Sequence, residues 1–281
     1  MKNIYSLNLS DDSELKSKFI IRELDEELSE RYNNTFFSKL ELERNARLPL
    51  WLKISQLVSG LISALLFCFF MYRMKSEDSF LGVLTSDWWI LLSSLLGVIY
   101  CTILWFIEKR QWKALLETEE YQLALRKWES TLEENARSLK IPEDAHLVDV
   151  FIFTYRLDKD GKVKKDHSGI NFWNMARKCF LEGENLCLAD EESVDGIPLS
   201  GLQKIVKIDK KATFMIWGEF TAEKKEKLKQ NKVKMDRYSN YAIKFYYSLQ
   251  FIADGEEFEI LFPSYELETI KNLTGLSVEE N

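Results

Sequence analysis

Two long stretches without a charged residue constrain this chain more than any other feature. Residues 54–72 provide 19 uncharged positions and residues 88–107 provide 20. A helix needs roughly 20 apolar residues to cross the hydrocarbon core of a bilayer. Both stretches therefore predict membrane-spanning helices, over about 52–72 and 88–107, in a hairpin that covers residues 49–107.

Aromatic residues border both stretches. Trp51 and Tyr72 lie at the ends of the first, and Trp88, Trp89 and Trp105 lie near the ends of the second. Amphipathic rings of this kind collect at the headgroup level of a bilayer. The alternative is a pair of buried core helices, which the lengths and the aromatic borders disfavour.

Basic residues near the stretches predict how the hairpin is oriented. Lys and Arg collect on the cytoplasmic side of membrane helices. The connection between the stretches carries only Arg73 and Lys75, and more basic residues lie outside them, namely Lys39, Arg44, Arg47, Lys53, Lys109, Arg110 and Lys113. We therefore expect a multi-pass membrane protein with both termini in the cytoplasm.

Charge and cysteine content narrow the function classes. A formal net charge of −7 argues against a general nucleic-acid binder without excluding a local nucleic-acid surface. Cys68 and Cys101 lie in the apolar stretches, and Cys179 and Cys187 would face a reducing cytosol. No disulfide is expected there.

Residues 1–48 are interpreted as a cytosolic N-terminal helical segment. Asp11, Asp12 and Ser13 would open the helix. The cluster at residues 33–35 would interrupt it. Apolar residues recur at four- or eight-residue steps among many charges, at Leu24, Leu28, Phe36 and Leu40.

Strong helix formers dominate the segment after the second stretch. No Gly or Pro occurs between Gly97 and Pro142, so one helix is predicted from residue 88 to residue 139, with a length of roughly 75 Å at about 1.5 Å per residue. Residues 108–141 would form a cytosolic stalk. An apolar seam predicts a coiled-coil partner, for which the N-terminal helix is the nearest candidate, and comprises Tyr121, Leu125, Trp128, Leu132 and Leu139.

Beyond Pro142 the apolar period changes from helical to alternating. VDVFIFTYRL is typical of a strand, DKDG of a turn, and ARKCFLEGENLCLAD of a hairpin that folds around Gly183. In YAIKFYYSLQF one face is apolar, which predicts a half-buried strand, with Ile243, Phe245, Tyr247, Leu249 and Phe251 on that face. Pro263 and Ser264 open a final helix that Gly275 closes. Residues 145–281 thus predict a mainly antiparallel β domain.

Two segments of this domain carry a family resemblance. NLCLADEESVDGIPLSGLQKIVKI and YYSLQFIADGEEFEILFPSYELETIKNLTG resemble the pleckstrin-homology-like (PH-like) domains of uncharacterised bacterial membrane proteins. The resemblance implies a bent barrel closed by a helix, which that superfamily uses to bind lipids, peptides or proteins. The segment KATFMIWGEFTAEKKEKLKQNKVKMDRYSN departs from the pattern and is interpreted as a long polar insertion.

The overall expectation is an α+β protein of the bacterial inner membrane, with a two-helix transmembrane hairpin, a helical stalk and a PH-like domain. We find no catalytic constellation, metal site or cofactor motif. Only His146 and His167 are present, too few for a histidine metal cage. Cys179 and Cys187 share one hairpin. A two- or four-residue turn would put them on opposite faces, whereas a three-residue turn would place them opposite one another.

Two basic clusters are candidate sites for an anionic ligand, because the domain would be tethered near an anionic leaflet. One lies in the polar insertion, at Lys224, Lys225, Lys227 and Lys229. The other lies at the first strand turn, where phosphoinositide-binding members of the superfamily carry basic residues, and comprises Lys162, Lys164 and Lys165. The alternative reading of the first cluster is a solvated loop, since acidic residues interrupt it.

Small and polar residues form one wall of each apolar stretch. The first wall comprises Gln56, Ser59, Gly60 and Ser63, and the second comprises Ser93, Ser94, Gly97 and Cys101. Small residues let helices approach closely, and a lipid-facing Gln would leave its amide without a hydrogen bond. These residues therefore predict helix contacts, either within one hairpin or between protomers.

Two functions fit this layout, and neither requires an enzyme. In the first, a cytosolic domain senses a small ligand or a protein and controls spans that oligomerise or open a pore. This layout resembles that of two-span effectors in bacterial antiviral and abortive-infection systems. In the second, the hairpin is an anchor and the PH-like domain recruits lipid or protein partners at the envelope.

Overall fold

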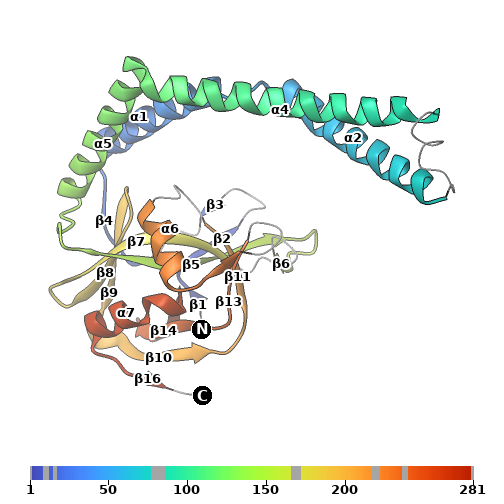
Figure 1. Cartoon of the computed structure of the whole chain (residues 1–281). Coiled ribbons are helices and arrows are strands. Elements are labelled where there is room, and N and C mark those ends of the chain that lie inside the picture. Colours follow the sequence, from blue (N-terminus) through green and yellow to red (C-terminus); the bar gives the residue numbers. More distant parts are fainter. Residues whose placement is uncertain are drawn as a thin grey trace. The chain divides into compact units, whose positions relative to one another are not determined.

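Figure 1 shows the computed structural model of the chain, which describes residues 2–8, 13–14, 18–76, 86–165, 172–216, 222–235 and 240–279. Asp11, Asp12 and His167 lie outside these ranges, as does the side chain of Lys165. The chain divides into two compact units. The sheet unit comprises Met1–Leu28 and Glu134–Asn281, and the helical unit comprises Ser29–Glu133.

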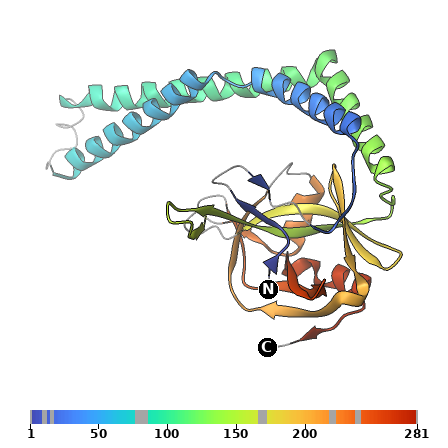
Figure 2. The ribbon, with the colours of Figure 1, turned by 180° about the vertical axis from the view of Figure 1, so that it is seen from behind.

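Four long helices build the helical unit: α1 (Glu26–Asn45), α2 (Leu50–Ser76), α4 (Trp88–Glu117) and α5 (Glu119–Ser138). The first turn of α1 and the last turn of α5 belong to the sheet unit. Helices α2 and α4 lie side by side in both views (Figures 1 and 2). Each is long and apolar enough to cross a membrane, as the two charge-free stretches predict.

The predicted single rod from residue 88 to residue 139 is wrong, because the helix breaks at Thr118. This residue has extended backbone angles, φ −75° and ψ 141°. Its hydroxyl accepts a hydrogen bond from the backbone N–H of Tyr121, at 3.3 Å, and so caps α5. A threonine cap followed by Glu119 and Glu120 is a helix start, which the absence of Gly and Pro concealed.

The predicted partner of the α5 seam is confirmed. The Trp128 ring lies 5.0 Å from the Tyr32 ring and 5.4 Å from the Phe36 ring of α1, measured between centroids. The Tyr121 hydroxyl donates to Glu43 Oε1 at 3.0 Å. Trp128 and Tyr121 are both buried as a result.

The N-terminal segment is not helical throughout, contrary to the prediction for residues 1–48. It forms the strands β1 (Lys2–Asn3), β2 (Ser6–Asn8), β3 (Ser13–Glu14) and β4 (Ile20–Glu23), and only then helix α1, which the cluster at residues 33–35 does not interrupt. Strand β1 pairs with residues 258–259, β2 with 153–155 and β4 with 193–195. Ile4, Tyr5 and Phe19 are buried in the main core of the sheet unit, and this burial favours strands.

Two groups of antiparallel strands form the body of the sheet unit. The first is β5 (His146–Leu157), β7 (Phe172–Glu182), β8 (Asn185–Ala189) and β9 (Ser193–Pro198), paired in sequence order. The second is β10 (Leu202–Ile208), β14 (Tyr246–Ala253) and β15 (Glu256–Pro263). Phe151 of β5 pairs with Leu261 of β15 and joins the two groups. The short strands β6 (Val163–Lys165) and β16 (Val278–Glu279) pair with β5 and β10.

The end of the chain follows the prediction. The turn η2 (Ser264–Glu266) leads into α7 (Leu267–Thr274), which Gly275 ends with a left-handed φ of 70°. Ile270 of α7 packs into one core with Ile205 of β10 and Leu249 of β14. Figures 1 and 2 accordingly show α7 against these two strands.

The segment interpreted as a polar insertion is instead part of the fold. It forms β11 (Ala212–Ile216), α6 (Ala222–Gln230), β12 (Lys234–Met235) and β13 (Tyr241–Ile243). Strand β11 runs parallel to β7 and antiparallel to β13. Phe214 and Leu228 of this segment are buried in a second core that contains Phe151. These two apolar residues face inward, whereas Met235 is 60% exposed.

The strand predicted as half buried is covered on both faces. It breaks between β13 and β14, and Tyr246 and Ser248, expected on the polar face, are buried. Tyr246 packs in the second core. Ser248 Oγ donates to Glu259 Oε2 on the neighbouring strand at 2.6 Å, and this bond makes burial of the hydroxyl possible.

Candidate functional site

The contact between α2 and α4 centres on Gln56. Its side-chain amide Nε2 donates to the backbone carbonyl of Cys101 at 3.0 Å. In return, Cys101 Sγ donates to the backbone carbonyl of Gln56 at 3.3 Å. The side-chain amide of Gln56 is therefore hydrogen-bonded by the other helix of the same hairpin, as an amide in an apolar environment requires.

Small residues continue the contact along the hairpin. Gly97 packs directly on Ser63, and a Cβ at Gly97 would overlap the Ser63 hydroxyl and lie 3.2 Å from the Ser59 hydroxyl. Ser94 Oγ donates to the Ser63 carbonyl at 2.9 Å. Gly60 is less tightly packed, since a Cβ there would lie 3.8 Å from Cys101 Sγ.

Ser93 does not take part in the contact within the hairpin, and its predicted role in a helix contact between protomers stays a prediction. Ser93 is exposed on α4, whereas its neighbour Ser94 is buried in the hairpin contact. A step of one residue turns a helix by about 100°, so only one of two adjacent serines can face α2. The remaining predicted residues of both walls lie in the contact: Gln56, Ser59, Gly60, Ser63, Gly97 and Cys101.

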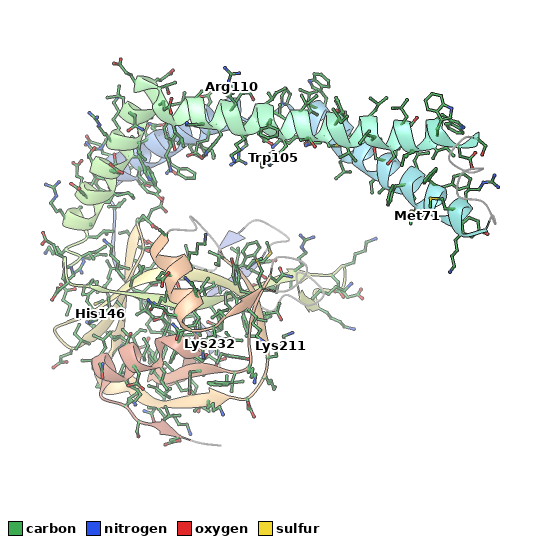
Figure 3. All side chains as sticks on the ribbon, in the orientation of Figure 1. Met71, Trp105, Arg110, His146, Lys211 and Lys232 are labelled. Carbon is green, nitrogen blue, oxygen red and sulfur yellow. The ribbon has the colours of Figure 1, made fainter. Side chains whose placement is uncertain are left out.

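The two ends of the hairpin are charged and its outer faces are apolar. Lys53 and Glu108 form an ion pair of 2.9 Å at one end, and Arg73 pairs with Asp87 at 3.1 Å at the other. Most apolar side chains point away from the helix pair, as Met71 and Trp105 do in Figure 3, whereas Phe70 and Ile90 are buried together. Leucines along both helices are more than half exposed, among them Leu57, Leu65 and Leu96.

The basic cluster of α6 is divided by the fold. Lys225 and Lys229 are exposed and could meet an anionic ligand. Lys224 is buried against Asp149, with Nζ 2.7 Å from Oδ1, and Lys227 pairs with the buried Glu266 at 2.5 Å. The prediction that all four lysines are available for an anion is therefore wrong, because two already neutralise buried carboxylates.

The second basic cluster stays on the surface. Lys162, in the turn between β5 and β6, and Lys164, in β6, are both exposed. Lys164 Nζ lies 3.9 Å from the Asp158 carboxylate, a long pair on an exposed side chain. Asp158 orders the turn, since its Oδ1 accepts hydrogen bonds from the backbone N–H groups of Asp160 and Lys162.

A buried polar network that sequence reasoning missed surrounds Asp149. Asn174 Nδ2 and the Tyr265 hydroxyl donate to Asp149 Oδ2 at 3.1 and 2.7 Å. The Asp149 N–H donates to Glu266 Oε1 at 2.8 Å. Burial raises the pKa of Glu266 to about 7, although Lys227 opposes the shift. The signal in the sequence was Asp149 itself, a carboxylate in the apolar run VDVFIF.

A second network ties the N-terminal strands to the turn between β8 and β9. The Tyr5 hydroxyl donates to Asp195 Oδ2 at 2.7 Å, and the Arg177 guanidinium lies over the Tyr5 ring, 5.1 Å from its centroid. Arg177 also forms an ion pair with Asp190, the first residue of the turn. Asp190 Oδ1 then accepts from the N–H groups of Glu192 and Ser193, which fixes the turn.

That turn holds both chain segments that lead to the helical unit. The N–H of Leu24, just before α1, donates to the Glu192 carbonyl at 2.9 Å. Asn135 Nδ2, at the end of α5, donates to the Glu191 carbonyl at 3.1 Å. Leu24 and Leu139 pack in one small core. In sequence, the helical unit lies between two segments of the sheet unit, and one turn of the sheet unit contacts both segments.

The cysteines of the β7/β8 hairpin do not form a site. The two-residue turn at 183–184 pairs Cys179 with Leu188 and Phe180 with Cys187, so the thiols lie on opposite faces, as predicted for this turn length. Burial raises the pKa of Cys179 to about 12 and that of Cys187 to about 11. Within the described ranges, no three His, Cys, Asp or Glu side chains gather closely enough to hold a metal ion.

Comparison of the chain with protein-family models, curated proteins and solved structures gives no match.

Proposed function

We propose that this protein is a non-enzymatic binding module, anchored in the bacterial inner membrane by the α2/α4 hairpin. The observation that carries the proposal is the distribution of polarity in the hairpin. Gln56, Ser63 and Ser94 use their polar groups within one chain, and the outer faces are apolar. Such a hairpin suits lipid on its outside and leaves few polar groups to line a pore.

The strand order supports a PH-like identity for the sheet unit. Four strands in sequence order, β5 to β9, are followed by the three strands β10, β14 and β15 and a terminal helix. Helix α7 covers the core between the two groups. This order supports the bent barrel closed by a helix that the sequence resemblance implies, with β11 to β13 as additional elements before β14. A domain of this type would bind a lipid headgroup, a peptide or a protein.

The pairing of the chain's two flanking parts supports the proposed topology. Strand β1 precedes the hairpin and pairs with β15, which follows it. Both parts fold together, so they lie on the same side of any membrane that α2 and α4 cross. The basic residues outside the spans favour the cytoplasmic side.

Cys68 provides the direct test of anchoring. Its side chain is exposed on α2, so water would reach it in a soluble protein and lipid would cover it in a membrane. We expect a charged, membrane-impermeant maleimide to leave Cys68 unlabelled in inverted vesicles and to label it after SDS is added, with labelling located by mass spectrometry.

A cysteine placed on α5 supplies the control for that test. Leu123 is 55% exposed and lies outside the apolar stretches. The variant Leu123→Cys should be labelled in intact inverted vesicles. Rapid labelling of Cys68 under the same conditions would contradict the membrane anchor.

A second candidate is a signal-gated effector, and one observation favours it. Leu24 and Asn135, on the two connections to the helical unit, are both held by the turn at 190–193. A ligand that alters this turn would act on both connections at once, and a homo-oligomer could then open. Gating predicts depolarisation, reported by a potential-sensitive dye, on induced expression of the full chain. No depolarisation under any trigger favours the anchor.

A further inference from the structure

The buried carboxylates of the Asp149 network form an acidic cluster under α6, which we call the recess. Asp149 is 2% exposed and Glu266 is fully buried, and the two are joined by the bond from the Asp149 N–H to Glu266 Oε1. Asn174 and Tyr265 complete the recess and both bond to Asp149. Two buried carboxylates in one place are stable only if cations or protons compensate them.

Helix α6 supplies the compensating charges. Lys224 and Lys227 are three residues apart and so share one face of the helix. Lys224 Nζ forms an ion pair with Asp149, and Lys227 Nζ forms one with Glu266. Lys227 Nζ also donates a hydrogen bond to the Leu147 carbonyl at 3.0 Å. Lys225 and Lys229 of the same helix are exposed. The helix therefore places two ammonium groups in the recess and two in solvent.

The described part of α6 offers few apolar side chains for docking. It has nine residues, AEKKEKLKQ, of which Leu228 is the one large apolar side chain. Helices shorter than about 12 residues are marginal by themselves in water. Among the described residues, the docking of α6 therefore draws mainly on one leucine and on the two ammonium groups in the recess, one of which also lies over the Tyr265 ring. A competitor with the same groups could replace it.

The recess has hydrogen-bond acceptors beyond those that α6 uses. Asn174 Oδ1 and Glu266 Oε2 are buried and have no hydrogen-bond partner among the described residues. Such groups are rare in folded proteins. An ammonium group offers three N–H donors, so another lysine side chain could use acceptors that Lys224 and Lys227 leave unused.

We propose that the recess of Asp149, Asn174, Tyr265 and Glu266 is a binding site for lysine ammonium groups, occupied internally by α6 and open to a lysine-bearing helix of a partner protein. The spacing of Lys224 and Lys227 defines the partner motif, two lysines three residues apart next to a leucine. This proposal rests on the binding function proposed above and names the chemistry of the partner. It does not depend on the membrane anchor, which the labelling of Cys68 tests separately.

The first experiment supplies α6 in trans. The full chain in detergent micelles is prepared as Lys224→Ala/Lys227→Ala, which vacates the recess, and as the matched control Lys225→Ala/Lys229→Ala. The probe is a fluorescent peptide AEKKEKLKQ, and AEAKEALKQ is its control. We expect the first variant to bind the lysine peptide at least tenfold more tightly than the matched control does, and not to bind the alanine peptide. Equal affinities would overturn the proposal.

A second experiment needs no substitution and so remains informative if the vacated variant misfolds. Lysines of the unaltered chain are acetylated in trace amounts and located by mass spectrometry, with and without millimolar AEKKEKLKQ. We expect the peptide to raise the acetylation of Lys224 and Lys227 severalfold relative to Lys225 and Lys229. The peptide also consumes acetylating reagent, but this lowers the acetylation of all four lysines equally. It therefore does not change the ratio between the two pairs of lysines. An unchanged ratio would show that α6 is a fixed part of the fold.

Discussion

Gly97 of α4 packs against Ser63 of α2 with no space for a side chain at position 97. We predict that Gly97→Ala destabilises the hairpin by about 1–3 kcal/mol, the usual cost of overpacking a tight contact. The Ser63 hydroxyl could rotate away, but Ser63 Cβ and the Ser59 hydroxyl would both remain at 3.2 Å from the new methyl group. Unfolding in mixed SDS micelles, followed by tryptophan fluorescence, measures the change.

Gly60→Ala is the matched control for that variant. Position 60 lies on the same contact, but a methyl group there would sit at an ordinary 3.8 Å from Cys101 Sγ. We expect a change within about 0.5 kcal/mol. Equal effects of the two substitutions would mean that the helices do not pack in this register.

Trp128 is the central contact between α1 and α5. It is buried against Tyr32 and Phe36, so Trp128→Ala should remove about 3–5 kcal/mol from the pairing of these helices. Faster amide hydrogen exchange in residues 29–45 would report the loss. Leu123→Ala, on an exposed part of α5, should leave exchange unchanged; slow exchange in both variants would show that the pairing does not depend on Trp128.

The exposed turn of Lys162 and Lys164 gives a prediction for lipid binding. Each basic residue near an anionic surface contributes about 1 kcal/mol, so Lys162→Glu/Lys164→Glu should weaken binding of the detergent-solubilised chain to phosphatidylserine vesicles at least tenfold. The loss should shrink as salt is added. Lys244→Glu reverses another exposed lysine of the same unit and should have little effect. Equal binding by all three proteins would remove this turn as a lipid site.

Features with a local cause could be predicted from the sequence. The composition alone predicts the apolar helices, at 52–72 and 88–107 against Leu50–Ser76 and Trp88–Glu117, although α4 continues ten residues beyond its charge-free stretch. The turn at Gly183 and the helix end at Gly275 were also placed, because each uses a positive φ that glycine adopts freely. The Trp128 seam was visible because helical periodicity repeats over several turns.

Features with a distant cause could not be predicted. Strands β1 and β2 have two and three residues, too few for a period, and their partners lie beyond residue 150. The sequence does not predict the Asp149 network for the same reason. In the sequence, Lys224 has the appearance of a surface residue in a charged run. The carboxylate that it pairs with in the buried network, that of Asp149, lies 75 residues earlier. The one sequence feature that indicates this network is Asp149, a charged residue in the apolar run VDVFIF.

Glu266 predicts an unusual pH dependence of stability. Burial raises its pKa from the ordinary value of 4.5 to about 7 in the folded state, so folding favours the protonated form. The stabilisation is complete below the unfolded pKa and is lost as the pH rises through about 7. At about 1.4 kcal/mol per unit, the sheet unit should lose up to about 3 kcal/mol over this window. Most proteins with buried, paired carboxylates behave in the opposite way.

The substitution Glu266→Gln isolates this effect from the other ionisable groups of the recess, which are Asp149, Lys224, Lys227 and Tyr265. The amide oxygen can still accept the bond from the Asp149 N–H, and the variant cannot titrate. Its stability should therefore change less than that of the unaltered chain between about pH 5 and pH 8. Glu268→Gln, an exposed carboxylate on α7, should leave the pH dependence as it is.

Cys179 and Cys187 allow the measurement to be made on the sheet unit alone. Both thiols are buried there, whereas Cys68 and Cys101 belong to the helical unit. After urea denaturation at each pH, a short labelling pulse at one fixed pH counts the molecules in which Cys179 and Cys187 have become accessible. The unaltered chain and Glu266→Gln could instead lose stability in parallel as the pH rises. That result would mean that Glu266 is ionised in the folded state throughout this pH range. The pairing with Lys227 would then offset the cost of burying the Glu266 carboxylate.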